Sequence, residues 1–275
     1  MSARIFELPK IDGHCHILDP LRFPYPADVP YQPRGQEVGS AAYFSHVMAA
    51  YGVRHALLVG PNSGYGTDNR CLLDAIAHGQ GRFKGVAVVP ADTSIDSLAD
   101  LKSKGIVGIA FNAALHGLAY YDDVDPLLTH LEALDMWAQF QVAGDQIVAL
   151  LPRIDKSGVK VMIDHCGRPN LADGLNAPGM QALAHLGRSG RCVVKLSGFS
   201  KFSQEGYPFD DARAHVEFAM RAFGPERCIW ASDWPHLRAD YRLDYGTLLT
   251  LAERWFTPDE CRQMMWDAPA KLLGW

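Results

Sequence analysis

The sequence predicts an α/β protein built as one (β/α)8 barrel, the TIM barrel. Short runs rich in apolar and β-branched residues alternate with segments of helical periodicity, eight of each. Several runs, such as HALLVGP and GVAVVP, are almost continuously apolar, which is typical of parallel strands buried on both faces. A chain of 275 residues also has the length of one such barrel.

The predicted strands and helices alternate regularly along the chain. The strands are expected at 11–17, 55–61, 83–90, 106–112, 137–142, 160–166, 192–198 and 228–234. The helices are expected at 40–51, 68–79, 94–104, 123–135, 145–157, 178–189, 209–223 and 245–256, and some follow N-cap residues, as at Thr93-Ser94. We therefore expect a single domain over residues 1–275. A two-domain doubly wound protein is disfavoured, because no composition shift marks a linker and no GxGxxG motif follows a strand.

Two long loops and a C-terminal extension should distort the barrel. Residues 18–38 contain five prolines and cannot form a regular element, and residues 113–122 carry a histidine and a tyrosine pair. Both segments follow predicted strands, the first and the fourth, so they belong at the C-terminal face, where TIM-barrel active sites lie. Residues 258–273 are predicted to form an extra helical pair that covers the outside of the barrel.

Composition indicates a soluble globular protein with a large core. Hydrophobic residues make up 48% and charged residues 21%, and the net charge of −5 argues against general binding to nucleic acid. None of the six cysteines forms a CxxC pair, which favours a reducing, cytoplasmic location. No apolar run reaches the length of a membrane span, and the first residues lack a signal-peptide core. We expect no membrane partner, and homo-oligomerisation stays open.

Polar residues at the ends of the predicted strands need an explanation. His14 and His16 would share one face of the first strand, since side chains at i and i+2 point the same way. His165 ends the sixth strand and Asp233 ends the eighth, so in a barrel all four would meet at one mouth. They could hold a divalent metal, or Asp233 could act as a general base while the imidazoles polarise a carbonyl. Taken one at a time, each of these four residues also has a purely structural explanation. Lys195, on the seventh predicted strand, could pair with a carboxylate such as Asp233.

Five motifs spread along the chain resemble the amidohydrolase superfamily. They are DGHCHILDP, GTDNRCLL, DHCGRPN, VVKLSGFSKFS and ASDWPH. The resemblance is to the amidohydrolase-2 branch, which contains 2-pyrone-4,6-dicarboxylate lactonases and sugar-acid lactonases of distorted TIM-barrel fold. It implies that Asp233, His165, His14 and His16 are catalytic. Asp233 would activate water and then protonate the leaving group, and the histidines would polarise the lactone carbonyl or hold a metal that does so.

The resemblance also implies a set of substrate-binding residues. Arg168 matches an arginine that recognises a substrate carboxylate. The other expected residues are Tyr31, Ser63, Asn112, His116, Lys201 and His236. Pyrone lactonases carry two further arginines at positions that correspond here to Ala110 and His116. Each lost hydrogen bond to a charged group costs about 1.5–3 kcal/mol, so a less charged lactone is expected as substrate.

The cofactor expectation follows from a missing lysine. Binuclear members of the superfamily need a bridging lysine on strand 4 or 5, and the corresponding runs IVGIAFNA and WAQFQV contain none. We therefore expect either one divalent metal ion, with zinc as the first candidate, or no metal ion. The predicted activity is hydrolysis of a small organic-acid or sugar-acid lactone. The alternatives are a mononuclear metal-dependent decarboxylase of an aromatic or unsaturated acid, and a binding module without catalysis.

Overall fold

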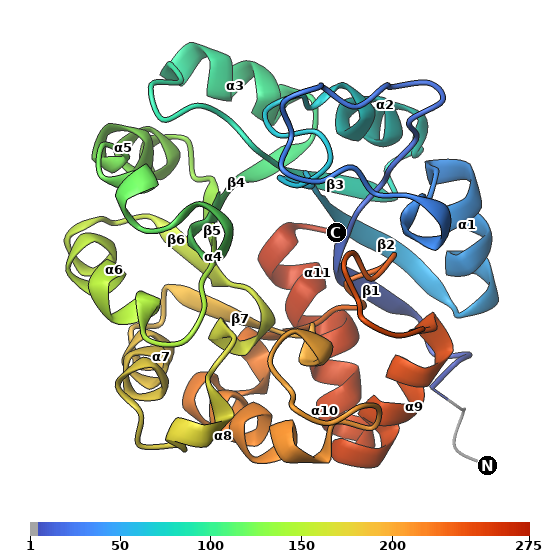
Figure 1. Cartoon of the computed structure of the whole chain (residues 1–275), viewed down its shortest axis with the longest axis vertical. Helices are drawn as coiled ribbons and strands as arrows, with labels where there is room; N and C mark the ends of the chain where they lie inside the picture. Colours follow the sequence, from blue (N-terminus) through green and yellow to red (C-terminus); the bar gives the residue numbers. More distant parts are fainter. Residues whose placement is uncertain (1–4) are drawn as a thin grey trace.

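Eight parallel strands form a barrel in the computed structural model, which describes residues 5–275. Each strand pairs with the next one in the sequence, in the order β1 to β8 (Figure 1). The strands are β1 (Lys10–Cys15), β2 (Val53–Val59), β3 (Phe83–Ala87), β4 (Ile106–Asn112), β5 (Trp137–Gln141), β6 (Lys160–Ile163), β7 (Cys192–Leu196) and β8 (Cys228–Trp230). The predicted TIM-barrel fold is confirmed.

The barrel is closed between β1 and the segment that follows β8. The backbone N–H of Asp233 donates to the carbonyl of His14 at 2.9 Å, and that of His16 donates to the carbonyl of Trp234 at 2.8 Å. The buried Asp12 carboxylate adds a tie, accepting from the backbone N–H of Ser232 at 3.0 Å. Closure therefore places the His-x-His segment directly beside Asp233.

A ring of helices surrounds the strands (Figure 1). These helices are α1 (Ala41–Ala50), α2 (Arg70–His78), α3 (Ile95–Ser103), α5 (Asp125–Ala133), α6 (Gln146–Lys156), α7 (Pro178–Arg188), α8 (Arg213–Phe223) and α9 (Tyr245–Trp255). All eight correspond to predicted helices. The largest difference is at α8, which begins later than residue 209 because Phe209 is left-handed (φ 60°) and a 3-10 turn follows it. No helix within residues 5–275 has the length and apolarity needed to cross a bilayer.

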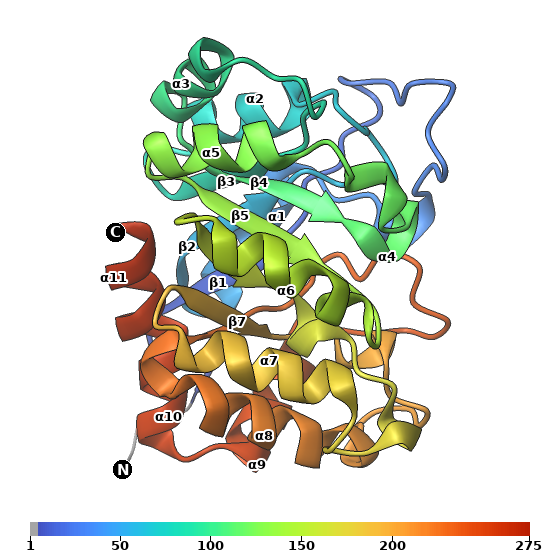
Figure 2. The same cartoon turned by 90° about the vertical axis from the view of Figure 1, so that its left-hand side faces the viewer.

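The sequence analysis expected residues 258–273 to cover the outside of the barrel, and only the first part of this segment does so, since Cys261, Met264 and Met265 pack in the hydrophobic layer shared with the surrounding helices. Its helices α10 (Pro258–Arg262) and α11 (Ala268–Leu273) are joined by a π-helical turn, and α11 lies at the end opposite the long loops (Figure 2). Leu273 packs with side chains from the barrel interior, including Leu57 and Met162. The ring of Trp275 stacks on His55 at 5.1 Å between centroids. The chain end therefore plugs the N-terminal opening of the barrel.

The long loops lie at the other end, where the strands point. Residues 18–38 contain only a 3-10 turn at Gly35–Glu37, as the proline content predicts. Residues 113–122 contain the one-turn helix α4 (Ala113–His116) and a second 3-10 turn. Figure 2 shows both segments extending beyond the carboxyl ends of the strands. They form part of the wall around the barrel mouth.

Candidate active site

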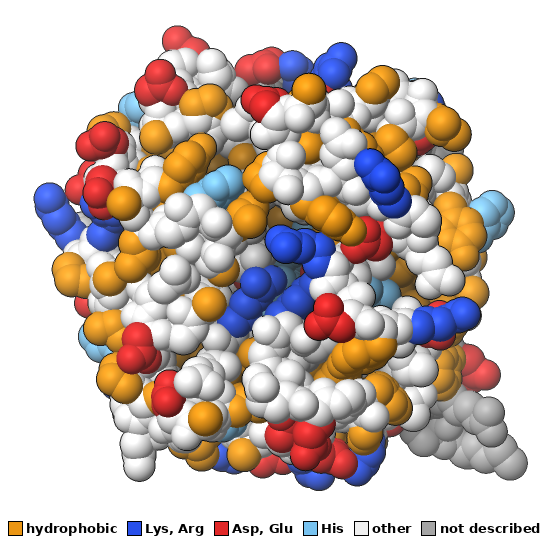
Figure 3. Space-filling model, in the orientation of Figure 1, with side chains coloured by type: hydrophobic (Ala, Val, Ile, Leu, Met, Phe, Trp, Pro, Cys, Tyr) orange, Lys and Arg blue, Asp and Glu red, His pale blue; other side chains and the backbone are white. Residues whose placement is uncertain are grey.

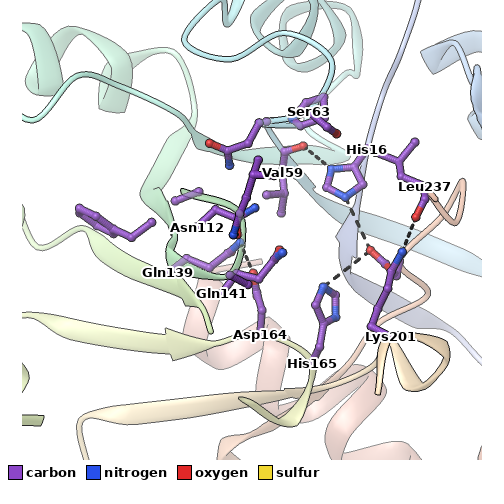
Figure 4. Close-up of a pocket in the computed structure, with 18 of the residues that line it drawn as sticks. His16, Val59, Ser63, Asn112, Gln139, Gln141, Asp164, His165, Lys201 and Leu237 are labelled. Atoms are coloured by element: carbon purple, nitrogen blue, oxygen red, sulfur yellow. Dashed lines mark hydrogen bonds and ion pairs between the residues drawn. The ribbon is translucent and has the colours of Figure 1, made fainter. Parts of the chain in front are cut away.

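Three imidazoles converge on one carboxylate oxygen at the barrel mouth, and Figure 4 shows two of these rings, those of His16 and His165. The Oδ1 atom of Asp233 lies 3.6 Å from Nε2 of His16, 3.8 Å from Nε2 of His165 and 3.9 Å from Nε2 of His14. All four side chains are buried. The structure thus brings together the four residues that the sequence analysis singled out as the catalytic set.

The local backbone directs these side chains inward. β6 and β8 end earlier than predicted, and His165 and Asp233 follow them in left-handed conformations, with φ of 52° and 57°. Such values are uncommon outside glycine and often accompany functional sites. Gly198 leaves room for the His165 ring, because a Cβ there would lie 2.5 Å from its Nδ1 atom. The sequence therefore turns the chain out of the sheet where the reacting side chains are needed.

The outer nitrogen of each imidazole has a partner that fixes the ring. The Nδ1 contacts are with the Val59 carbonyl for His16 (2.8 Å), the Ser197 hydroxyl for His165 (2.9 Å) and the Asp164 carboxylate for His14 (3.3 Å). Partners of this kind orient metal-binding and catalytic histidines and select their tautomers. The Nε2 atoms are left to face Asp233.

The electrostatics of the cluster favour neutral imidazoles at His14 and His165 beside an ionised carboxylate. Burial lowers the pKa of His14 to about 4 and lowers the pKa of His165 well below its usual value. Burial alone would raise the pKa of Asp233, but the interactions with His165, His16 and Lys201 outweigh it and hold that pKa well below its ordinary value. The Nε2 atom of His14 is buried without a hydrogen-bond partner among the described residues. The ligand atoms of His14, His16 and Asp233 lie within 4.8 Å of one another and could hold a metal ion.

A second polar network lies directly beneath the cluster. Nζ of Lys195 lies 3.2 Å from Oδ1 of Asp164 and 2.5 Å from Oε1 of Gln139, and Gln139 in turn donates to Oδ2 of Asp164 at 2.9 Å. Burial raises the pKa of Asp164, but Lys195 and His14 more than reverse this and leave it below its usual value. Of the pairings open to Lys195 in the sequence, the structure has the one with Asp164 and not the one with Asp233.

The cluster opens into a cavity of about 260 Å³ with cationic walls. Arg168, Lys201 and Arg238 line it, and Nζ of Lys201 lies 3.9 Å from Oδ2 of Asp233. Figure 3 shows Lys and Arg side chains gathered around a hollow in the centre of this face. Neither Arg168 nor Arg238 has an ion pair with a carboxylate among residues 5–275. No described carboxylate therefore neutralises either guanidinium group, and both can meet an anionic ligand.

Arg238 is a lining residue that the sequence analysis did not identify. It lies in the loop after β8, shortly beyond Asp233, where its backbone N–H donates to Glu37 at 2.5 Å. Its guanidinium lies over the Tyr31 ring, 5.4 Å from the centroid, and the Tyr31 hydroxyl donates to the same Glu37 carboxylate. The sequence feature that could have identified Arg238 is its position just after the ASDWPH motif, in a loop that runs along the barrel mouth.

The predicted substrate-binding residues divide into two groups. Those among the residues that line the cavity are Ser63, Asn112, Arg168 and Lys201. Tyr31, His116 and His236 are not among them. The His116 ring stacks on Tyr120 at 4.6 Å, and His236 faces a separate groove beside Trp234. The left-handed backbone of His236, with φ of 67°, belongs to the turn that carries it away from the cavity.

The chain is similar to known proteins along almost its whole length. The family model described as Amidohydrolase matches residues 11–275. The chain is 30% identical to 4-sulfomuconolactone hydrolase of Rhizobium radiobacter over 98% of this chain and 92% of that protein. It is 25% identical to 2-pyrone-4,6-dicarboxylate hydrolase of Comamonas testosteroni over 97% and 91% of the two chains.

A solved structure extends the comparison to three dimensions. The crystal structure of a probable 2-pyrone-4,6-dicarboxylic acid hydrolase from Acinetobacter baumannii, with citric acid bound, matches with a TM-score of 0.86 and 27% identity. The match covers 97% of this chain and 99% of that one. With a family model that spans almost the whole sequence, the chain belongs to the amidohydrolase-2 family.

Proposed function

We propose that this protein is a hydrolase that opens a small organic-acid lactone. The observation that carries the proposal is the convergence of three imidazole Nε2 atoms on Oδ1 of Asp233, at 3.6–3.9 Å, in a buried mouth with cationic walls. The relatives named as hydrolases of sulfomuconolactone and pyrone dicarboxylate support the same reaction class. Opening a cyclic ester requires a base for water, a group that stabilises the oxyanion, and an acid for the leaving oxygen.

Asp233 serves as the base in this proposal. Its low pKa keeps the carboxylate ionised at neutral pH, so it can accept a proton as water attacks the carbonyl. His16 donates its Nδ1 proton to the Val59 carbonyl, which leaves Nε2 as an acceptor for the second hydrogen of that water. The protonated Asp233 then returns its proton to the ring oxygen as the carbonyl–oxygen bond breaks. Water and lactone thus give a hydroxy acid.

The oxyanion forms on the imidazole side of the site. Nδ1 of His165 lies 2.9 Å from the Ser197 hydroxyl, which can donate to it, so that Nε2 carries the proton and faces the carbonyl oxygen. The Nε2 atom of His14 has no other partner and faces the same region. Fixed donors in a buried site stabilise a developing oxyanion by several kcal/mol.

The cluster also offers ligands for a single divalent ion. The ligand atoms of His14, His16 and Asp233 lie within 4.8 Å of one another, and imidazole nitrogens with a carboxylate oxygen form a donor set that suits zinc. When bound, the ion would polarise the lactone carbonyl as a Lewis acid. The residues that would hold it are His14, His16, His165 and Asp233.

The substrate in this proposal carries an acid group. Arg168, Lys201 and Arg238 surround the cavity, and a guanidinium can bind a carboxylate or sulfonate with two parallel hydrogen bonds. The similar structure from Acinetobacter baumannii holds citric acid, which supports an anionic ligand.

We also propose that residues 1–275 form one domain and that the protein acts in the cytoplasm. Six free, buried cysteines support the latter.

A substrate panel tests the function directly. Lactones with zero, one and two acid groups would be assayed with a pH indicator, because ring opening of each releases one proton at neutral pH. We expect turnover of at least one acid-bearing lactone. Aromatic and unsaturated acids assayed for carbon dioxide release test the decarboxylase alternative. Carbon dioxide release without any lactone turnover would replace our proposal with that alternative.

A further inference from the structure

Lys195 is a buried ammonium group that the proposed reaction does not use. The residue lies on β7 and is completely buried. Its Nζ atom is 2.5 Å from Oε1 of Gln139, 3.2 Å from Oδ1 of Asp164 and 3.3 Å from Nδ1 of His14. An ammonium has three N–H donors and no acceptor. Its three neighbours match those donors in number.

The Nδ1 atom of His14 faces two groups with opposite demands. Asp164 lies 3.3 Å away and only accepts, whereas Lys195 lies 3.3 Å away and only donates. With its proton on Nδ1, His14 donates to Asp164 and one N–H of Lys195 loses its partner. With its proton on Nε2, His14 accepts from Lys195, all three Lys195 donors are used, and the Nε2–H faces Oδ1 of Asp233 at 3.9 Å. A buried donor without a partner costs free energy, and an N–H facing the Asp233 carboxylate is favoured over a lone pair facing it, so the second arrangement is favoured.

His14 differs in this respect from its neighbour in the His-x-His motif. The Nδ1 atom of His16 has the Val59 carbonyl as its partner, and a carbonyl can only accept. His16 is thereby fixed with its proton on Nδ1 and its lone pair on Nε2. The two rings lie 4.9 Å apart, yet their surroundings select opposite tautomers.

We propose that Lys195 is a positioning residue that holds His14 in the Nε2–H tautomer, which makes His14 a hydrogen-bond donor in the site and a weak metal ligand. The donor role rests on the proposed lactone hydrolysis, whereas the tautomer and the metal affinity do not. A metal ion can bind His14 only after the proton leaves Nε2. The proton then moves to Nδ1 and Lys195 loses a hydrogen bond. The network beneath the site thus opposes tight binding of a metal.

The tautomers can be measured without any substrate. Long-range ¹H–¹⁵N spectra of metal-free protein distinguish protonated from unprotonated imidazole nitrogens, and the His14→Gln and His16→Gln variants assign the signals. We expect the proton on Nε2 in His14 and on Nδ1 in His16. A wild-type His14 with its proton on Nδ1 would overturn the proposal.

Zinc affinity gives a second readout that is independent of turnover. Lys195→Met removes the three donors and leaves Asp164 to accept from Nδ1 of His14, an arrangement that strengthens a metal-ligating histidine. Competition with a chromophoric chelator should show zinc binding that is tighter by about tenfold or more. Asp164→Asn should shift the affinity in the opposite direction. Weaker binding in both variants would reduce Lys195 to a purely structural role.

Lys10→Met is the matched control. Lys10 is also completely buried, but it lies at the start of β1, far from the mouth, where it donates to the carbonyls of Leu8 and Tyr51 at 2.6 Å each. The zinc affinity of the Lys10→Met variant should equal that of the wild type. If Lys195→Met does not fold, Lys195→Gln can be used. Gln keeps two donors on one nitrogen but removes the charge, and we expect an intermediate zinc affinity.

Discussion

Oδ1 of Asp233 lies 3.6 Å from Nε2 of His16, across the seam where the two ends of the barrel sheet meet. Two backbone hydrogen bonds at this seam hold the pair in register. The carboxylate is therefore fixed by the same contacts that close the barrel. We expect it to be the element of the site that is hardest to replace.

Asp233→Asn should remove activity and preserve the fold. An amide cannot accept the proton of the attacking water, and loss of a general base typically costs a factor of 10² to 10⁴ in rate. We expect kcat for an acid-bearing lactone to fall by about 10³, with an unchanged far-ultraviolet circular dichroism spectrum. Turnover at the wild-type rate in a folded variant would exclude Asp233 as the base.

Arg168 and Arg238 should contribute to binding of the acid group. Each faces the cavity without an ion pair to a described carboxylate, and a hydrogen bond to a charged group is worth about 1.5–3 kcal/mol. Arg168→Gln and Arg238→Gln should each raise KM for an acid-bearing lactone by roughly tenfold to a hundredfold. A neutral lactone is the control substrate, and its KM should change little. Equal losses on both substrates would mean that these arginines maintain the shape of the site.

Zinc should bind with a stoichiometry of at most one ion per chain. The ligand atoms of His14, His16 and Asp233 lie within 4.8 Å of one another, which suits one ion. Calorimetric titration of chelator-treated protein should give one site, and His16→Gln should weaken it at least tenfold. His46→Gln, at an exposed histidine on α1, is the control and should bind as the wild type does. Two equivalents bound in the wild type would contradict a mononuclear site.

The fold was predictable because its signal is repeated along the chain. Eight buried strands each produce an apolar run, and the helices between them keep a 3.6-residue period, so errors at single boundaries do not change the architecture. Of the two C-terminal helices, only α11 lies away from the surface where the sequence analysis expected it. Their apolar residues, such as Leu273, indicate burial but do not specify which surface buries them.

The site was predictable where its residues lie on strands or directly after them. His14 and His16 follow from strand periodicity, and Asp233 follows from its place after β8. Residues farther along a loop were harder to place. Arg238 and His236 both lie in the loop after β8, yet one lines the cavity and the other faces away, because left-handed turns in this loop set their directions. The hydrophobic periodicity that predicts strands and helices does not predict such turns.

His236 should make stability depend on pH. Burial lowers its pKa to about 4, whereas an unfolded histidine titrates near 6.5. The unfolded state therefore binds more protons between these values, and the free energy of unfolding falls as the pH drops from about 6.5 to about 4. For this residue the loss is about 3 kcal/mol. Urea denaturation at pH 7 and pH 4.5 should show a smaller loss in His236→Gln than in the wild type, and equal losses would contradict burial of a neutral imidazole.

The C-terminal plug should stabilise the barrel without affecting the reaction. Leu273 is buried in the barrel interior, and Leu→Ala substitutions in such cores cost about 2–5 kcal/mol because they leave a cavity. Leu273→Ala should therefore lower the free energy of unfolding by about 3 kcal/mol in urea denaturation. KM and kcat should stay unchanged at a temperature where the variant is folded, since the plug and the site lie at opposite ends of the strands (Figure 2). Leu272→Ala, at the partly buried neighbouring position, is the matched control and should cost less. Equal costs at both positions would show that the helix as a whole, and not the inserted Leu273 side chain, closes the barrel.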